Sequence, residues 1–103
     1  MTAKYLKKKS KMATIKINTS EIETGWIFEV TVSNGNSTTH NVNLTSEYYE
    51  HLSLSDTTPT KLVDGSFRFL LEREPKEMIL RTFDLKIISH YFSEYERKIS
   101  KYV

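Results

Sequence analysis

Hydrophobic and polar residues alternate along three segments in the first half of the chain, a period typical of a strand with one buried face. These segments span residues 13–18, 26–33 and 37–44. Asn34 and Gly35 separate the second segment from the third and favour a two-residue hairpin turn, because both tolerate positive φ. The pattern predicts a three-stranded antiparallel meander, with Trp26 heading its apolar face and His40 as a histidine at the edge of the core.

The other face of the predicted sheet is polar and its charge is balanced. It carries Thr14, Lys16, Ile27, Glu29, Thr31, Thr39, Asn41 and Asn43. Sheets that bind RNA expose aromatic side chains on which the bases stack, and this face has none. We therefore expect no nucleic-acid binding through the sheet.

Polar stretches and capping residues mark the connections in the first half of the chain. Residues 19–24 and 53–57 are polar and predict loops. Thr45 or Ser46 is a suitable cap for a short helix over residues 47–52, and Glu47 is well placed in its first turn.

Residues 59–74 predict the central helix of the domain. Thr58 provides a capping hydroxyl, Pro59 suits the first helical position, and Pro75 disfavours helical backbone in the residue before it. On a helical wheel the apolar residues cover nearly twice the arc of about 100° that a helix on one surface needs. We therefore expect a helix covered on two sides, with Phe67 against the sheet and Phe69 against a second layer.

Short helices are predicted for the C-terminal third. Residues 76–82 form one or two turns, Asp84 caps a helix over residues 85–92, and Ser93 with Glu96 forms a capping box that opens a last helix. The predicted fold class is α+β: a three-stranded antiparallel β-meander followed by a central helix and a C-terminal layer of short helices.

Charge divides the chain into a basic tail and an acidic body. Five lysines lie within the first eleven residues, where no acidic residue occurs: Lys4, Lys7, Lys8, Lys9 and Lys11. The remaining residues include ten basic and thirteen acidic side chains, so their net charge is −3 although the whole chain carries +2. We expect residues 1–12 to be a disordered basic tail and residues 13–103 to be a single domain.

The composition excludes several classes of chemistry. The chain has no cysteine, which excludes disulfides and thiolate metal sites. It has no long apolar run and no secretory signal, so we expect no membrane contact and a cytoplasmic location. No two histidines have metal-binding spacing, and three glycines provide no phosphate-binding loop, so we expect no metal and no cofactor.

The helical half resembles a known group of sequences. Residues 66–96 include FLLEREPKEMIL and FDLKIISHYFSEYE. They resemble a group of short uncharacterised bacterial proteins that share an FLLEREP…IL…FDL…YF(P/S)EYE pattern. Ser93 stands where the group tends to have proline. The group has no known activity, so the resemblance implies a bacterial source and a standalone fold and transfers no site.

The C-terminal third contains more apolar side chains than one helix face can bury. Packing in the core is one interpretation, and a surface that binds a partner through Phe69, Tyr91 and Tyr95 is the other. The sequence favours a non-enzymatic protein-interaction or regulatory module with a protein partner. The alternative is a nucleic-acid-associated protein that binds through the lysines of the tail, and a small-molecule enzyme is the third reading.

Overall fold

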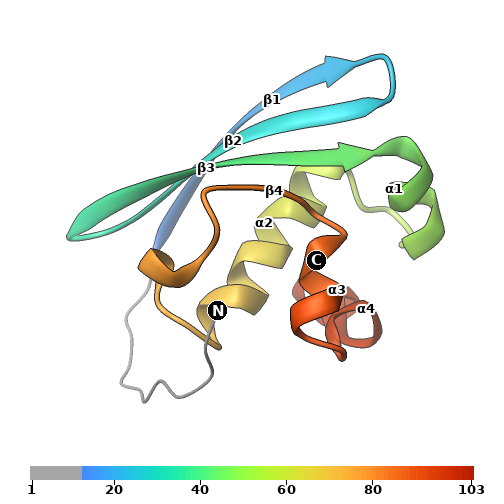
Figure 1. Ribbon diagram of the computed structural model, residues 1–103. Helices are drawn as coiled ribbons and strands as arrows, with labels where there is room; N and C mark the ends of the chain where they lie inside the picture. The colour runs from blue at the N-terminus through green and yellow to red at the C-terminus, as the bar shows by residue number, and fades with distance from the viewer. Residues whose placement is uncertain (1–12) are drawn as a thin grey trace.

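Three strands from the first half of the chain and one short strand from the second half form a sheet, and helices cover one face of it (Figure 1). The computed structural model describes residues 13–103, so the basic tail predicted for residues 1–12 lies outside the described residues. The elements are β1 (Thr14–Ile22), β2 (Gly25–Asn34), β3 (Asn36–Thr45), α1 (Ser46–Leu52), α2 (Pro59–Leu71), the 3-10 helix η1 (Lys76–Met78), β4 (Thr82–Asp84), α3 (Ile87–Tyr91), α4 (Tyr95–Lys98) and the 3-10 helix η2 (Ile99–Tyr102). The α+β class and the meander are confirmed.

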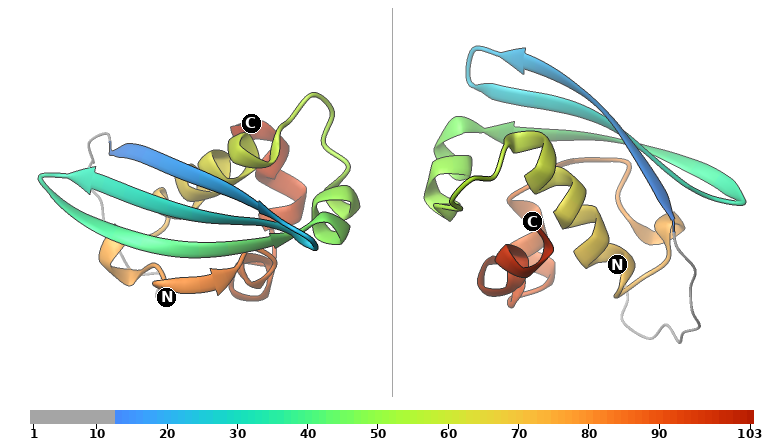
Figure 2. Two further views of the ribbon diagram at one scale, coloured as in Figure 1. Left: turned by 90° about the horizontal axis from the view of Figure 1, so that it is seen from above. Right: turned by 180° about the vertical axis from the view of Figure 1, so that it is seen from behind.

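The sheet has the strand order β1-β2-β3-β4. The first three strands pair in an antiparallel manner, with Ile17 opposite Val30 and Val30 opposite His40. Figure 2 shows that the helices lie on one side of this twisted sheet and leave its other face open. The buried residues of β2 and β3 point toward α2, which places the core between the sheet and that helix.

The strand β1 is longer than the sequence pattern indicates. The predicted loop over residues 19–24 is wrong, because β1 continues to Ile22 and pairs with β2 up to Gly25. Residues 18–22 are all exposed, so no hydrophobic alternation marks them as a strand. Gly25 closes this hairpin at a φ of 155°, and a side chain there would meet the carbonyl of Leu44. Backbone pairing therefore extends this end of the hairpin without a buried face, and the Thr19 hydroxyl lies within hydrogen-bonding distance, 2.8 Å, of the Thr60 hydroxyl of α2.

The fourth strand was not predicted. Residues 82–84 pair in parallel with β3, and the Asn41 N–H donates to the Arg81 carbonyl at 2.7 Å. Only Phe83 of these three residues is buried, so the segment is too short to show a period. The helix predicted over residues 85–92 is correspondingly shorter, since α3 begins at Ile87.

The predicted capping box before α4 is absent. The cap position of α4 is Glu94 rather than Ser93, and it makes no side-chain capping bond. Glu96 instead accepts a hydrogen bond from the Tyr48 hydroxyl at 2.6 Å. A contact with another element has therefore replaced the local pairing that the sequence suggested.

The helix α2 is buried on two sides, as its wide apolar arc predicts. Thr58 caps it by accepting a bond from the Lys61 N–H at 3.1 Å. It ends at Leu71 rather than at Glu74, because the Arg73 N–H turns to the Leu70 carbonyl three residues back. The side chains of α2 meet the sheet on one side and the C-terminal helices on the other.

Trp26 contributes less to the core than the sequence suggests. It is half-buried at the end of β2, where its ring meets Tyr49 of α1 edge-on, with 5.3 Å between the ring centroids. Phe28, the next residue on the same face, is fully buried. Trp26 therefore closes the rim of the core, and Phe28 occupies its interior.

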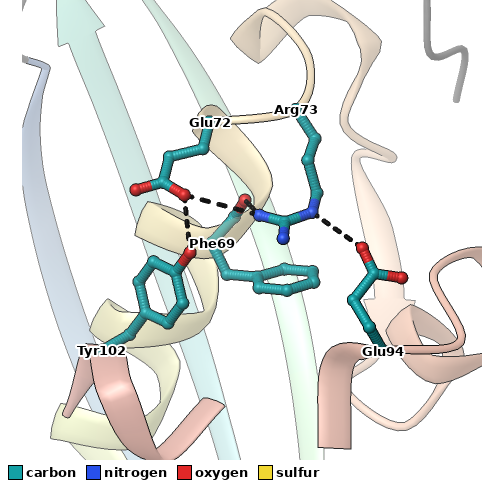
Figure 3. A network of polar contacts seen from close by, with 5 residues as sticks. All are labelled: Phe69, Glu72, Arg73, Glu94 and Tyr102. Carbon is teal, nitrogen blue, oxygen red and sulfur yellow. Dashed lines mark hydrogen bonds and ion pairs between the residues drawn. The ribbon is translucent and has the colours of Figure 1, made fainter. Parts of the chain in front are cut away.

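Arg73 joins the end of α2 to the C-terminal layer (Figure 3). Its guanidinium lies 3.6 Å from the centroid of the Phe69 ring and donates to the Phe69 carbonyl at 2.9 Å. The same group donates to Glu94 at 3.2 Å, and the Tyr102 hydroxyl donates to Glu72 at 2.5 Å. Burial disfavours the charge of Arg73, but hydrogen bonds with Tyr102 and Glu94 outweigh it and raise its pKa. The network covers Phe69 and stabilises the C-terminal layer.

Candidate functional site

An open surface pocket of about 400 Å³ lies between α1 and the C-terminal helices. Small-molecule sites in proteins commonly have volumes of roughly 300–1,000 Å³. Its charged and polar wall is formed by Glu47, Tyr48, His51, Lys86, Ser89 and Glu96. The site therefore draws on segments that are far apart in the sequence.

Glu96 lies at the centre of the contacts in this pocket. One of its carboxylate oxygens accepts the Tyr48 hydroxyl at 2.6 Å, and the other lies 3.5 Å from Nε2 of His51. The rings of Tyr48 and His51 are stacked, with centroids 5.7 Å apart. Tyr48 is 6% exposed, so its phenol is held in place, whereas the His51 side chain is 61% exposed and faces solvent.

Local capping bonds position the two walls. Thr45 accepts a bond from the Tyr48 N–H at 3.0 Å and thereby begins α1. On the opposite wall the Asp84 carboxylate accepts the Lys86 N–H at 3.1 Å, and the Ser89 hydroxyl donates to the Lys86 carbonyl at 2.9 Å. These bonds fix the backbone at both walls, and Lys86 and His51 are among the residues that line the pocket.

The chemistry of Tyr48 is that of a hydrogen-bond donor. Burial raises its pKa well above the ordinary value of 10, and the hydrogen bond to Glu96 raises it further. A hydrogen bond with Ser89 opposes this rise in part. The phenol therefore keeps its proton at physiological pH, and the pocket offers fixed donors and carboxylate acceptors rather than an activated nucleophile.

The edge of β1 is a second candidate surface. Within residues 13–103, β1 has a neighbouring strand on one side only, and its second half is exposed at every position from Asn18 to Ile22. Ile22 and Ile27 are 40% and 42% exposed on the open face of the sheet at the same end. Half-buried Trp26 lies on the opposite face of this hairpin end, where β1 and β2 extend away from α2 (Figure 2).

The three side chains proposed as partner-binding from the sequence lie in different environments. Phe69 and Tyr95 are both fully buried, and their rings meet edge-on with centroids 5.3 Å apart. The fold therefore corrects the sequence interpretation for these two residues, because neither has surface for a partner. Tyr91 is 47% exposed, and its ring contacts His90. The tail lysines lie outside the described residues.

His40 is a buried core histidine, as predicted. Nδ1 lies 2.8 Å from the Leu80 carbonyl and therefore carries the proton, so Nε2 accepts the Thr38 hydroxyl at 2.7 Å. Burial lowers its pKa below 6.5, the Leu80 carbonyl opposes this shift, and the charge of Arg81 adds to it. In residues 13–103 no group of three or more histidine, cysteine and acidic side chains is arranged to hold a metal ion.

Sequence reasoning did not find the pocket. Glu96 was expected only as part of a capping box with Ser93. Tyr48 and Glu96 are separated by 48 positions, so no local spacing could have brought them together. One sequence feature could have pointed to this pocket: many polar and ionisable residues lie at the predicted ends of the short helices.

Comparison of the chain with protein-family models, with curated proteins and with solved structures finds no significant match. Among the helices of residues 13–103, none combines the length and the hydropathy that crossing a bilayer requires. The class that the fold defines is therefore a small α+β domain, and any assignment of function rests on its surfaces.

Proposed function

We propose that this chain is a non-enzymatic cytoplasmic protein-interaction module that binds an extended segment of a partner protein along β1. The observation that supports this proposal is the exposure of β1 from Asn18 to Ile22 at the edge of the described sheet. An edge strand presents unpaired N–H and C=O groups that can accept another strand. Trp26, Ile22 and Ile27 flank this edge and supply apolar contact area of the kind that anchors interfaces.

Adjacent proline substitutions test the edge. In an antiparallel ladder, neighbouring residues alternate between bonding to the next strand and pointing outward. One of Ser20→Pro and Glu21→Pro should therefore disrupt the pairing with β2, whereas the other should remove only an outward donor. Thermal melting of both variants identifies the tolerated one, which then reports on binding with the fold intact.

The probe is a random peptide library displayed on phage and selected against the immobilised full chain. We expect enriched peptides whose binding shifts the amide NMR signals of β1, and affinity about tenfold weaker in the tolerated proline variant. Lys61→Gln on α2 is the control and should bind normally. Failure to enrich any peptide over the support alone, or peptides that bind the proline variant equally well, would contradict the proposal.

The uneven distribution of charge along the chain supports a second candidate function, nucleic-acid binding through the tail. The lysines of the tail carry +5 while the remainder of the chain carries −3. Phosphate contacts give affinity that falls steeply with salt. Binding to a duplex DNA should therefore disappear when residues 1–11 are deleted, and binding that survives this deletion would exclude the tail as its source.

A further inference from the structure

We propose that the pocket between α1 and the C-terminal helices binds a small zwitterion of the α-amino acid class, a ligand distinct from the peptide that β1 would bind. The argument rests on which charges the pocket brings together. Two carboxylates, Glu47 and Glu96, share the lining with one ammonium, Lys86. A ligand that satisfies all three must carry both a positive and a negative group.

The acceptors of the pocket are on two walls. Glu47 lies in the first turn of α1, and Glu96 projects from α4 on the other side. The Tyr48 hydroxyl satisfies one oxygen of Glu96 and holds the carboxylate in position. The other oxygen, 3.5 Å from His51, can accept an additional donor because each carboxylate oxygen has two lone pairs. This oxygen is the expected site for a ligand ammonium.

Lys86 supplies the positive charge of the lining, and Ser89 lies near it in the sequence. Both belong to the segment that begins α3, and both line the pocket. The Lys86 ammonium can donate to an anion, whereas the Ser89 hydroxyl already donates to the Lys86 carbonyl at 2.9 Å. A ligand carboxylate beside Lys86 and a ligand ammonium beside Glu96 are therefore both matched by charge.

The same charges exclude other small ligands. A phosphate would share the lining with the two carboxylates of Glu47 and Glu96, and like-charge repulsion disfavours it. A simple amine would leave Lys86 without a counter-charge and would be repelled by it. The pocket volume of about 400 Å³ is within the range of small-molecule sites and accommodates a free amino acid.

The experiment titrates the free L-α-amino acids, in pools, into the isotope-labelled full chain and follows its amide NMR signals. We expect saturable shifts at Tyr48, His51 and Ser89 with at least one amino acid. The methyl ester of that amino acid lacks the carboxylate and its N-acetyl form lacks the ammonium. Each should bind about tenfold more weakly or worse, because each loses a charge-assisted contact.

Protein variants assign the two poles. Lys86→Gln should weaken the free amino acid about tenfold and should not weaken the methyl ester, because the ester lacks the partner of Lys86 and its ammonium is repelled by that residue. Glu96→Gln should weaken the amino acid while its amide oxygen still accepts the Tyr48 hydroxyl. The matched controls are Lys61→Gln on α2 and Glu50→Gln, which lies on α1 and does not line the pocket; both should bind normally.

Three results would overturn the inference. The first is an absence of pocket shifts with every pool at millimolar concentrations. The second is an ester or an N-acetyl derivative that binds as tightly as the free amino acid. The third is unchanged affinity in Lys86→Gln. Peptide binding at β1 uses different residues and a different probe, so either proposal can fail while the other stands.

Discussion

Phe67 and Phe69 lie two residues apart on α2 and bury their rings on opposite sides of that helix. The Phe67 ring meets His40 of β3 at 5.3 Å and Phe83 of β4 at 6.1 Å. The Phe69 ring meets three aromatic residues of the C-terminal layer instead, namely Phe92, Tyr95 and Tyr102. One helix thereby joins the two layers of the domain. A substitution on either face of this helix tests its packing against one layer only.

Phe67→Ala and Phe69→Ala should destabilise the domain to a similar extent. Both rings are fully buried, so each truncation should lower the free energy of unfolding by about 3–5 kcal/mol. Denaturant unfolding measures both, and Ile27→Ala at a surface position should cost under about 0.5 kcal/mol. A near-neutral Phe69→Ala would show that the C-terminal layer does not cover α2.

Trp26→Ala should be milder than Phe28→Ala. Trp26 is half-buried at the rim and Phe28 is fully buried, so we expect costs of about 1–2 kcal/mol and about 3–5 kcal/mol in the free energy of unfolding. The Trp26→Ala variant should keep a dispersed NMR spectrum. A poorly dispersed spectrum, typical of a molten state, would show instead that Trp26 is the main contributor to the core.

His40 should make the folded state less stable as the pH falls below about 6.5. Burial lowers its pKa in the folded state, so between this lowered value and 6.5 the unfolded chain binds a proton that the folded chain does not. Stability from this residue is fully present above pH 6.5 and is lost progressively below it. The carboxylates of Glu77 and Glu94 have pKa values lowered below 4.5, so their contribution is lost only at more acidic pH.

Substitution by glutamine tests this pH window. His40→Gln removes the titrating group, so the loss of stability between pH 7 and pH 5 should shrink relative to the native chain. His90→Gln alters an exposed histidine and should leave the profile unchanged. Denaturant unfolding across this pH range gives both profiles, and equal slopes in His40→Gln and the native chain would contradict the assignment.

Gly65→Ala should destabilise the domain even though alanine favours helices. A Cβ at this position of α2 would lie 2.7 Å from the Tyr102 carbonyl oxygen and 2.7 Å from Cγ1 of Val103. The C-terminal residues would have to shift, at a cost of about 1–3 kcal/mol. Thermal or denaturant unfolding measures this loss.

Truncation of the chain provides the control for Gly65→Ala. In a chain that ends at Lys101 the obstructing atoms are absent, so alanine should stabilise by up to about 1 kcal/mol through its helix propensity. The sign of the effect should therefore reverse between the two backgrounds. The same sign in both would show that Gly65 is required for a reason other than the approach of the C-terminus.

The sequence by itself determined the features that depend on local spacing. The alternation in β2 and β3, the Asn34-Gly35 turn and the Thr58-Pro59 start of α2 each involve residues within a few positions of one another. The width of the apolar arc of α2 also predicted that this helix is covered on both sides. Such signals are reliable because periodicity, turns and caps depend on the backbone geometry of residues that are neighbours in the sequence.

Only the tertiary structure decided the features that join distant segments. The parallel pairing of β4 with β3 depends on where the chain returns after α2, and Phe83 alone carries no period. The pocket exists because Tyr48 meets Glu96 across two layers, at the expense of the capping box that Glu96 was expected to form. Hydrogen bonding and burial at these positions are set by how the layers stack, and residue spacing along the chain does not encode that arrangement.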